Sequence, residues 1–541
     1  MTRNQGARNP LGMLLGAAGL VAVLTLVSRL FGFARWLGQA TWVGADFVGN
    51  AYASANQIPN VIFEVVVGGA LASITVPLLA KAISAELRDE INSTASALFT
   101  WTLTLLVPLG VALFLGADVI AGWLPVSVGS DAAAQNMLAA MFLRIFSPQI
   151  PLYGVAVVLG GVLQAHHRFA WPAIMPALSS VVIITAYAVY GSLAAANPRD
   201  FAALQVLGWG TTLGAVALSI PLFIPVHQLG IRLHLTWKMP REQFLKALEL
   251  GAYGIGALLA AQGYMLATLF LTRWGGVVGT INVFQYAQAI YMLPYALFTF
   301  PVATVVFPLL TKQFAAREEA EVKRLATSST ALVAGLSMLG VAGLVAIAPA
   351  MAAIFSWNKP IPGLQTAILA MAPALVGYAL LYHLSRVFIA TDHAKHSFWA
   401  AVVGWTVAAA GGWLLIVILA PGRGDGINTL LALGLGNAIG MSAAGLYLLV
   451  AWHAHHPGAP RQVLAAIGIC LPGTAIGAWG GFKIYALLMS LSLPAGLLWA
   501  TLAAGTVSVV CCVPGLMYAA KPFVRQTRQA RQPNPGTSGE V

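Results

Sequence analysis

Two arginines near the end of the first apolar segment are the residues best suited to bind an anion inside this chain. They lie in the stretch Ser28-Arg29-Leu-Phe-Gly-Phe-Ala-Arg35, and Arg29 is about 27 Å along a helix that begins at Leu11. An arginine that faces lipid near the membrane centre costs about 3 kcal/mol on insertion scales, so we expect Arg29 to face protein or water. A guanidinium suits a phosphate because its planar fork offers paired donors and stays charged. Arg35 has an alternative role, in which it reaches the outer membrane interface.

The second apolar segment carries polar side chains where a bend is expected. Asn60 and Glu64 lie four residues apart and therefore share one helix face, and Pro59 frees a backbone carbonyl. Glu64 is the only acidic residue well inside the apolar segments of the first half. It either pairs with Arg29 or Arg35, or it binds a coupling proton or cation.

Two further residues complete the candidate site. Arg144, beside Pro148 and Pro151, is either a cavity cation or a helix-packing residue. Gly32, between the two arginines, is a candidate hinge together with Pro59. The candidate substrate-binding set is Ser28, Arg29, Arg35, Asn60, Glu64 and Arg144.

The sequence offers no set of residues for enzyme, metal or cofactor chemistry. It contains no P-loop, nucleophile elbow or paired catalytic carboxylates. The groups His166-His167 and His453, His455 and His456 have no carboxylate or cysteine at ligand spacing, so we interpret them as hydrated residues at the ends of apolar segments. We therefore predict no enzyme chemistry, no cofactor and no metal.

The composition excludes a soluble protein. Of the 541 residues, 59% are hydrophobic and only 8% are charged, with a mean hydropathy of +0.83, whereas a soluble chain is about one quarter charged. The net charge of +12 would suggest nucleic acid as a partner of a soluble protein. Here most Lys and Arg residues fall on alternate connections between apolar segments, so we expect the membrane and no nucleic acid as the partner.

The fold class that follows is an all-α polytopic membrane protein with about 14 transmembrane helices. Lys and Arg concentrate on the connections that lie inside when the N-terminus is cytoplasmic, so both termini are predicted to be cytoplasmic. The expected spans are 11–34, 50–80, 94–122, 134–165, 170–194, 202–226, 246–272, 280–311, 326–355, 362–390, 396–420, 428–452, 463–488 and 491–520.

An internal repeat organises these spans. Residues 69–81 resemble residues 300–312 at an offset of 231, and Tyr153 pairs with Tyr378 at an offset of 225. The displacement is six spans, so the copies keep the same orientation, and substrate is expected between the two halves. The predicted parts are a cytoplasmic N-terminus (1–10), an N-lobe (11–226), a basic cytoplasmic linker (227–245), a C-lobe (246–456), two last spans that form a lipid-tail groove (457–520) and a basic disordered tail (521–541).

Several stretches of this sequence resemble the MurJ/MviN family of lipid II flippases, which belongs to the multidrug/oligosaccharidyl-lipid/polysaccharide exporter superfamily. The stretch from Ser28 to Arg35 is similar to the first span of that family and is the most specific feature. Further similar positions are Pro59-Asn60, Gly69-Ala70, Pro77, Arg168-Phe169, Pro172, Pro176, Arg386, Phe388, Ala390 and Asp392. The resemblance implies two six-helix lobes around a cationic cavity, and alternating access that moves an undecaprenyl-diphosphate-linked peptidoglycan precursor outward across a bacterial inner membrane.

The chain departs from the family at charged positions. Phe63 and Ala289 stand where the family has arginines, and Gly68 stands where it has a glutamate, so this is a divergent member. The prediction is a lipid II flippase, that is, a transporter driven by the membrane potential or an ion gradient, with cell-wall synthesis proteins as further partners. One alternative is an exporter of another polyprenyl-linked glycan or an amphiphilic drug, and a second is a non-transporting membrane scaffold for cell-wall enzymes.

Overall fold

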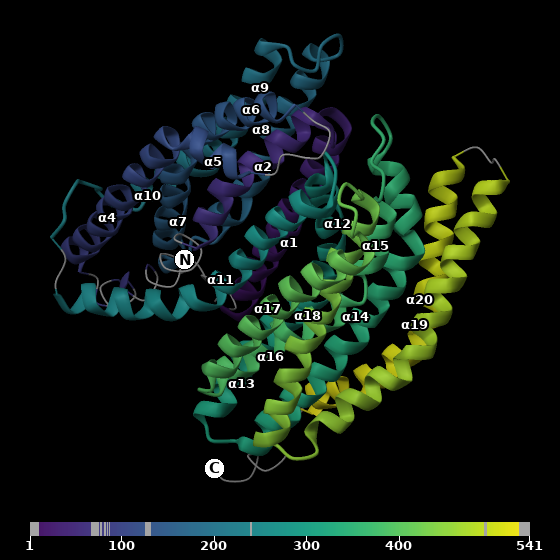
Figure 1. Cartoon of the computed structure of the whole chain (residues 1–541). Coiled ribbons are helices and arrows are strands. Elements are labelled where there is room, and N and C mark those ends of the chain that lie inside the picture. Colours follow the sequence, from purple (N-terminus) through teal and green to yellow (C-terminus); the bar gives the residue numbers. More distant parts are fainter. Residues whose placement is uncertain are drawn as a thin grey trace, which may run out of the picture. The chain divides into compact units, whose positions relative to one another are not determined.

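The protein is helical throughout the part that the structure describes. The computed structural model describes residues 10–65, 87–124, 131–238, 241–491 and 495–529, with the isolated positions 75, 78, 79, 83 and 85. Side chains are not described for residues 10–19, 21–22, 241–257 and 527–529. Within the described residues there is no strand. The chain divides into two compact units, unit 1 (Met1–Gln262) and unit 2 (Gly263–Val541), which are purple to teal and teal to yellow in Figure 1.

Unit 1 consists of helices that pack on one another. Its described elements are α1 (Pro10–Gly38), the π-helix η1 (Gln39–Val43), α2 (Phe47–Ile62), α4 (Arg88–Leu115), α5 (Ala117–Trp123), α6 (Ala132–Phe146), α7 (Gln149–Ala165), α8 (Ala170–Leu193), α9 (Phe201–Ser219), the 3₁₀-helix η3 (Ile220–Leu222) and α10 (Phe223–Gln228). Aspartates start three of these helices, because the carboxylates of Asp46, Asp131 and Asp200 accept the first free backbone N–H groups of α2, α6 and α9. α11 (Arg241–Gly275) crosses the boundary between the units.

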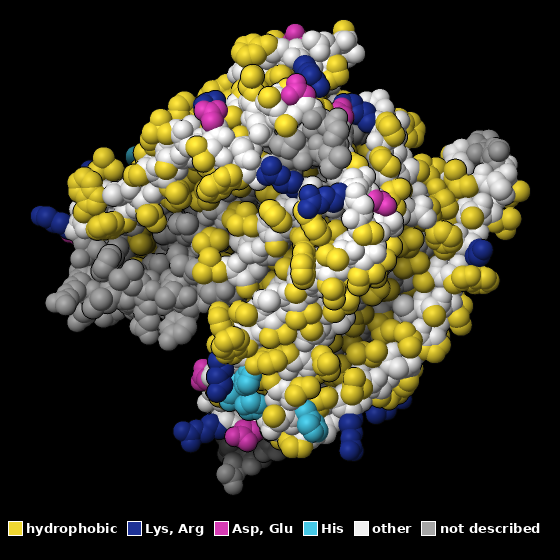
Figure 2. All heavy atoms as spheres, viewed as in Figure 1, with side chains coloured by type: hydrophobic (Ala, Val, Ile, Leu, Met, Phe, Trp, Pro, Cys, Tyr) yellow, Lys and Arg dark blue, Asp and Glu magenta, His cyan; other side chains and the backbone are white. Residues whose placement is uncertain are grey.

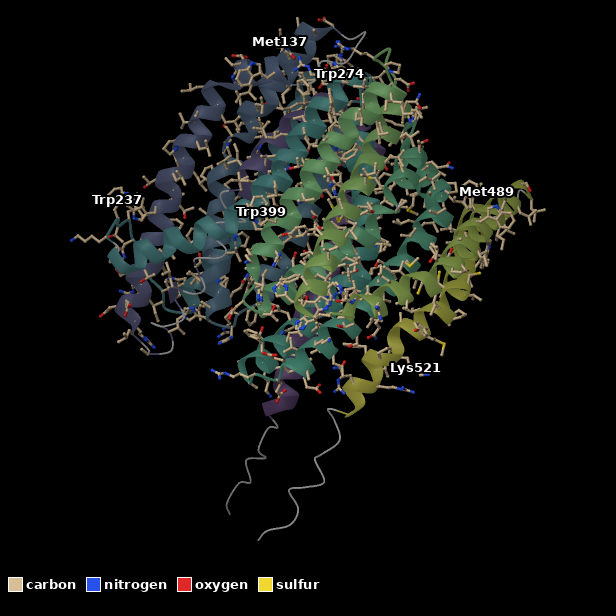
Figure 3. The ribbon with its side chains drawn as sticks, turned by 60° about the horizontal axis from the view of Figure 1, so that its bottom comes forward. Met137, Trp237, Trp274, Trp399, Met489 and Lys521 are labelled. Atoms are coloured by element: carbon tan, nitrogen blue, oxygen red, sulfur yellow. The ribbon has the colours of Figure 1, made fainter. Side chains whose placement is uncertain are left out.

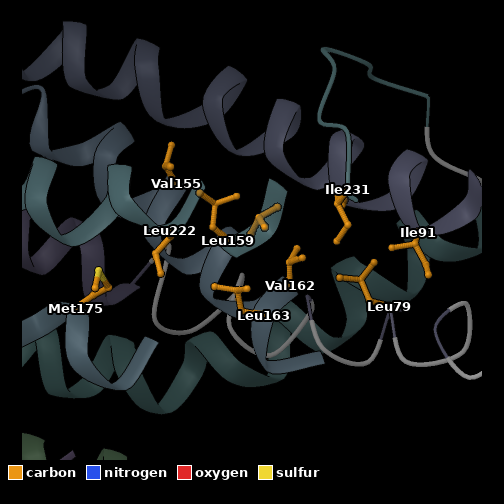
Figure 4. Close-up of a cluster of buried hydrophobic side chains, with 11 residues drawn as sticks. Leu79, Ile91, Val155, Leu159, Val162, Leu163, Met175, Leu222 and Ile231 are labelled. Atoms are coloured by element: carbon orange, nitrogen blue, oxygen red, sulfur yellow. The ribbon is translucent and has the colours of Figure 1, made fainter. Parts of the chain in front are cut away.

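A buried apolar cluster holds one end of unit 1 together. Leu159, Val162 and Leu163 on α7 pack with Leu222 and with Ile231, which follows α10. Figure 4 shows these side chains converging with those of Leu79, Ile91, Val155 and Met175. Apolar packing alone therefore holds helices α4, α7 and α10 against one another.

The segment that follows α10 binds along α4 in an extended conformation. The N–H groups of Arg232, His234 and Thr236 donate to the side chains of Asn92, Ser96 and Thr100 at 3.2, 3.2 and 2.9 Å. The indole of Trp237 donates to Thr104 at 3.0 Å. Every fourth residue of a helix advances about 6 Å and every second residue of an extended chain about 6.6 Å, so the two ladders stay in register. The predicted linker is thus held to α4 over residues 231–238.

Unit 2 contains the remaining helices. They are α12 (Thr280–Pro294), the π-helix η4 (Tyr295–Thr299), α13 (Phe300–Ala315), α14 (Glu319–Phe355), α15 (Leu364–Met371), α16 (Ala374–Ala390), α17 (Ala394–Leu419), α18 (Gly426–His455), α19 (Ala459–Ser490) and α20 (Gly496–Gln529). α19 and α20 form an antiparallel pair that packs on α14 (Figure 1). Hydrophobic side chains cover most of the face of this unit seen in Figure 2, while Lys, Arg, His and acidic residues gather at its lower end.

Helix ends in the two units repeat at the offsets seen in the sequence. α4 begins at Arg88 and α14 begins at Glu319, 231 residues later. α7 covers residues 149–165 and α16 covers residues 374–390, a shift of 225. A π-helical turn also follows the second-span helix in both units, at residues 63–65 and at η4. The first repeat match, residues 69–81, lies largely outside the described residues.

Ten described helices are long and apolar enough to cross a membrane, or up to 11 when α15 and α16 count as one bent span. α15 and α16 meet at an angle of 50°, where Pro373 precedes α16. The other three expected spans, 11–34, 50–80 and 246–272, contain residues or side chains outside the described part. The count of 14 and the exact division into lobes stay predictions, as do the cytoplasmic N-terminus and the tail beyond residue 529.

Candidate functional site

The two arginines of the opening motif lie on α1 and point in different directions. Arg35 lies six positions after Arg29, so their side chains leave the helix about 120° apart. Arg29 is exposed and Arg35 is half-buried, with its guanidinium 5.7 Å from the ring centre of Trp36. Ser28 is buried. α1 runs without a break through Gly32, so the hinge at this glycine stays a prediction.

A group of buried hydroxyls lies within electrostatic range of Arg35. The Tyr52 hydroxyl on α2 is 2.9 Å from the hydroxyls of both Tyr187 on α8 and Thr211 on α9. Arg35 acts electrostatically on Tyr52 and on Tyr153 of α7. One guanidinium of α1 therefore lies near phenols from two other helices, so a charge that suits an anion stands beside polar groups that are already hydrogen-bonded within the protein.

Phe63 packs on this group instead of adding a charge to it. Its ring centre lies 4.7 Å from that of Tyr153, and the Tyr153 hydroxyl donates to Gln149 Oε1 at 3.1 Å. Phe63 stands at the position where the resemblance implies an arginine. The site in unit 1 is consequently more aromatic than the resemblance implies.

The shared helix face of Asn60 and Glu64 stays a prediction. α2 ends at Ile62, where the Phe63 N–H donates to the carbonyls of Pro59 and Asn60, and residues 63–65 form a π-helical turn. Glu64 is exposed and Asn60 is half-buried. Within the described residues no ion pair joins Glu64 to Arg35.

Arg144 forms an ion pair that the sequence analysis did not identify. Its guanidinium binds the Asp118 carboxylate of α5 at 2.5 Å, and the two side chains are 38% and 71% exposed. Asp118 was missed because it lies near the end of its apolar segment, where an acid is normally a hydrated residue. The pair connects α5 to α6 and favours the packing role of Arg144 over the cavity role.

Unit 2 has its own arginine–tyrosine cluster. Arg386 on α16 hydrogen-bonds the Tyr382 hydroxyl and Thr304, and its guanidinium lies 5.8 Å from the ring centre of Phe300. Tyr295 contacts both Tyr382 and Tyr378, with ring centres 5.0 and 4.9 Å apart. Tyr378 is the repeat partner of Tyr153, so each unit places a guanidinium near the tyrosines of its fourth span. The signal was present in the sequence as the motif residue Arg386, but its partners come from separate helices.

The histidines near the ends of α17 and α18 gather into one group. The ring centre of His455 lies 4.5 Å from that of His393 and 5.3 Å from that of His396. Only His455 belongs to a histidine group that is visible in the sequence, because His393 and His396 are brought to it by the packing of α17 on α18. Among the described residues, no group of three or more His, Cys, Asp and Glu residues has the arrangement of a metal site.

The chain matches one protein family over most of its length. The sequence model described as "Lipid II flippase MurJ" matches residues 39–503. The chain is 30% identical over 279 residues to a Rhizobium meliloti protein named "Probable lipid II flippase MurJ", which covers 50% of each chain. A Rickettsia prowazekii protein of the same name is 22% identical over 392 residues, or 71% of this chain and 75% of that one. The chain thus spans about half the length of the Rhizobium meliloti relative that it matches.

Two solved structures share the fold. The structure titled "Lipid II flippase MurJ, inward closed conformation" superposes with a TM-score of 0.69 at 19% identity, covering 94% of this chain and 99% of that one. An inward-facing multidrug resistance MATE family transporter superposes with a TM-score of 0.65 at 15% identity, covering 81% and 99%. These likenesses establish the arrangement of helices and carry no information on substrate.

Proposed function

Because the chain belongs to the lipid II flippase MurJ family, we propose that it is a transporter that moves lipid II from the inner to the outer leaflet of a bacterial inner membrane. The polar, charged head group needs a polar path, while the polyprenyl tail is stable only in an apolar surrounding. Arg29 and Arg35 attract the diphosphate of the head group. The tail remains in lipid or along α19 and α20.

The proposal rests on the environment of the Arg35 side chain. This residue is half-buried on α1, and α1 packs on α8, whose Tyr187 belongs to the buried hydroxyl cluster with Tyr52. A cation near hydroxyl groups inside a helical membrane unit stabilises an anion that has left water. Arg386 with Tyr382 supplies a comparable group in unit 2.

The experiment is complementation of a strain depleted of its lipid II flippase. We expect the wild-type chain to restore growth, and Arg29→Ala and Arg35→Ala to abolish it at normal membrane abundance. Arg88→Ala is the matched control, because Arg88 is an exposed residue at the start of α4. Growth with both α1 variants would remove these arginines from the mechanism. Failure of the correctly inserted wild-type chain would favour the scaffold role.

A different lipid-linked glycan is the second candidate substrate. Phe63 packs on Tyr153 where the resemblance implies an arginine, and Ala289 supplies no charge on α12. Aromatic faces suit sugar rings better than phosphates. Binding of lipid II to the purified protein, compared with other polyprenyl-linked sugars, separates the two candidates.

The coupling ion and the orientation belong to the same proposal. An ion gradient or the membrane potential drives transport, with exposed Glu64 as the group that binds the proton or cation. Both termini lie in the cytoplasm, and cell-wall synthesis proteins are the protein partners. Glu64→Gln should abolish dependence on the coupling ion while binding of lipid II persists. Cysteine labelling from each side of the membrane tests the orientation.

A further inference from the structure

Helices α14, α19 and α20 enclose two adjoining pockets at one end of unit 2. Each has a volume of about 340 Å³, and Gln462 of α19 lines both. Figure 3 marks Lys521 at this end of α20 and Met489 near the opposite end of the helix pair. The charge pattern of the sequence places this end in the cytoplasm.

The walls of the two pockets are cationic. Lys323 and Arg324 line the first, and Lys521 and Arg525 line the second. Neither lining includes an aspartate or glutamate. Glu321, outside the linings, binds Arg324 at 2.7 Å. The pockets therefore carry a net positive charge and favour an anion.

Backbone dipoles add to this charge. α14 begins at Glu319 and α19 begins at Ala459, and both are long helices whose first turns lie at the pockets. Gly458, with φ of 83°, turns the chain into α19 and lines the first pocket. The positive ends of two helix dipoles thus meet the same space, which is a common arrangement for binding phosphate groups.

A buried hydroxyl in the first pocket makes no hydrogen bond within the described residues. Thr327 lines this pocket and is 5% exposed. Its Oγ1 atom has no hydrogen-bond partner among the described residues. A buried hydroxyl without a partner costs about 1–3 kcal/mol, so an acceptor oxygen of a ligand would relieve this cost.

Large apolar side chains are exposed on the same two helices, α19 and α20. Leu464, Met517 and Tyr518 are 55%, 68% and 46% exposed on the outer faces of α19 and α20, and Tyr518 itself lines the second pocket. Side chains of this kind contact acyl chains in a membrane. The occupant therefore combines an anionic head with an apolar body.

We propose that these pockets bind the phosphodiester head group of an anionic phospholipid from the inner leaflet. Lys521, Arg525 and Lys323 neutralise the phosphate, and Thr327 donates to one of its oxygens. The acyl chains lie against Leu464 and Met517. The site is formed by residues of unit 2 alone and includes none of the arginines of α1. Its lipid is one that stays in its leaflet rather than the lipid that is flipped.

The test is native mass spectrometry of the purified protein with phosphatidylglycerol and, separately, phosphatidylcholine. We expect phosphatidylglycerol to bind more tightly, and the Lys521→Ala/Arg525→Ala double variant to bind it about 30-fold more weakly, since each basic residue contributes about a factor of five. Arg461→Ala is the matched control, because Arg461 is exposed in the first turn of α19 and lines neither pocket. It should change binding by less than about twofold.

Thr327→Val supplies a second arm. This variant should bind phosphatidylglycerol about fivefold more weakly while its melting temperature in phosphatidylcholine is unchanged or higher. Equal loss in the double variant and in Arg461→Ala would show mere surface attraction and overturn the site. Stabilisation by inorganic phosphate alone, with the same dependence on Lys521 and Arg525, would assign the pockets to a free phosphate and overturn the lipid.

Discussion

Arg144 on α6 binds Asp118 on α5 through an ion pair of 2.5 Å. The pair is partly exposed, so its contribution to stability is about 0–1 kcal/mol. Its position joins the end of one expected span to the next span, across residues 125–130, which lie outside the described part. The ion pair explains why an arginine lies in an apolar segment, and this explanation needs no role for Arg144 in substrate binding.

We predict that Arg144→Ala and Asp118→Asn each lower stability by less than about 1 kcal/mol, and that the double variant loses no more than either single variant. Thermal unfolding in detergent measures the coupling. Both variants should retain transport in the complementation assay. Loss of transport in Arg144→Ala but not in Asp118→Asn would instead assign Arg144 to the substrate path.

The Tyr52 hydroxyl hydrogen-bonds to the hydroxyls of Tyr187 and Thr211. Removing it should lower stability more than breaking the Arg144–Asp118 pair. Tyr52→Phe removes one oxygen that serves two buried partners at 2.9 Å, so we expect a loss of about 1–3 kcal/mol. Tyr291→Phe is the control, because Tyr291 is buried and its hydroxyl has no hydrogen-bond partner among the described residues. A melting temperature equal to wild type in Tyr52→Phe would show that the hydroxyls are satisfied in another way.

The amino-acid sequence was sufficient for the order of the helices. The expected spans 94–122 and 326–355 overlap most of α4 and α14, whose observed starts lie six and seven residues earlier, and the expected spans 134–165 and 362–390 end where α7 and α16 end. This agreement arises because helix length in a membrane is dictated by bilayer thickness. Asp46, Asp131 and Asp200 mark helix starts for a local reason that is visible in the sequence.

Contacts between distant helices could not be predicted in this way. Nothing in the sequence pairs Arg144 with Asp118, because both lie in segments whose relative rotation depends on packing. The π-helical turn at Phe63 could not be predicted either, because a regular 3.6-residue period does not anticipate such a turn. The position of the two units relative to each other, and hence any cavity between them, stays a prediction.

The extended segment 231–238 should detach locally when its acceptor is removed. Thr100 accepts from the Thr236 N–H at 2.9 Å, so Thr100→Val should speed hydrogen exchange of that amide by about five- to tenfold. Thr104→Val should leave this amide protected and change the fluorescence of Trp237, whose indole donates to Thr104. Identical exchange in wild type and Thr100→Val would show that the ladder does not hold the segment.

His456 makes the stability of unit 2 depend on pH. Burial, followed by the charges of Lys323 and His455, lowers the pKa of His456, which His393 also lowers and Glu319 raises. The folded state therefore binds fewer protons than the unfolded state, and stability falls as the pH drops below about 6.5. Melting curves between pH 5 and pH 8 should show a smaller fall in His456→Gln. His227→Gln, at an exposed position at the end of α10, should retain the wild-type pH dependence.

Close approach of α17 and α18 depends on glycines at the contact. A Cβ atom at Gly436 would lie 2.4 Å from the backbone nitrogen of Gly412 and 2.9 Å from the carbonyl oxygen of Ala408. Both are backbone atoms, so the helices themselves must separate, and Gly436→Ala should cost about 1–3 kcal/mol. Gly343→Ala on α14 is the matched variant, because a Cβ there meets nothing within 4 Å. This substitution should raise the stability of the protein by up to about 1 kcal/mol, because alanine lowers the entropy of the unfolded chain and has a better helix propensity than glycine. Thermal unfolding of the two variants in the same detergent compares them directly. Equal melting temperatures would mean that α17 and α18 lie further apart than this packing requires.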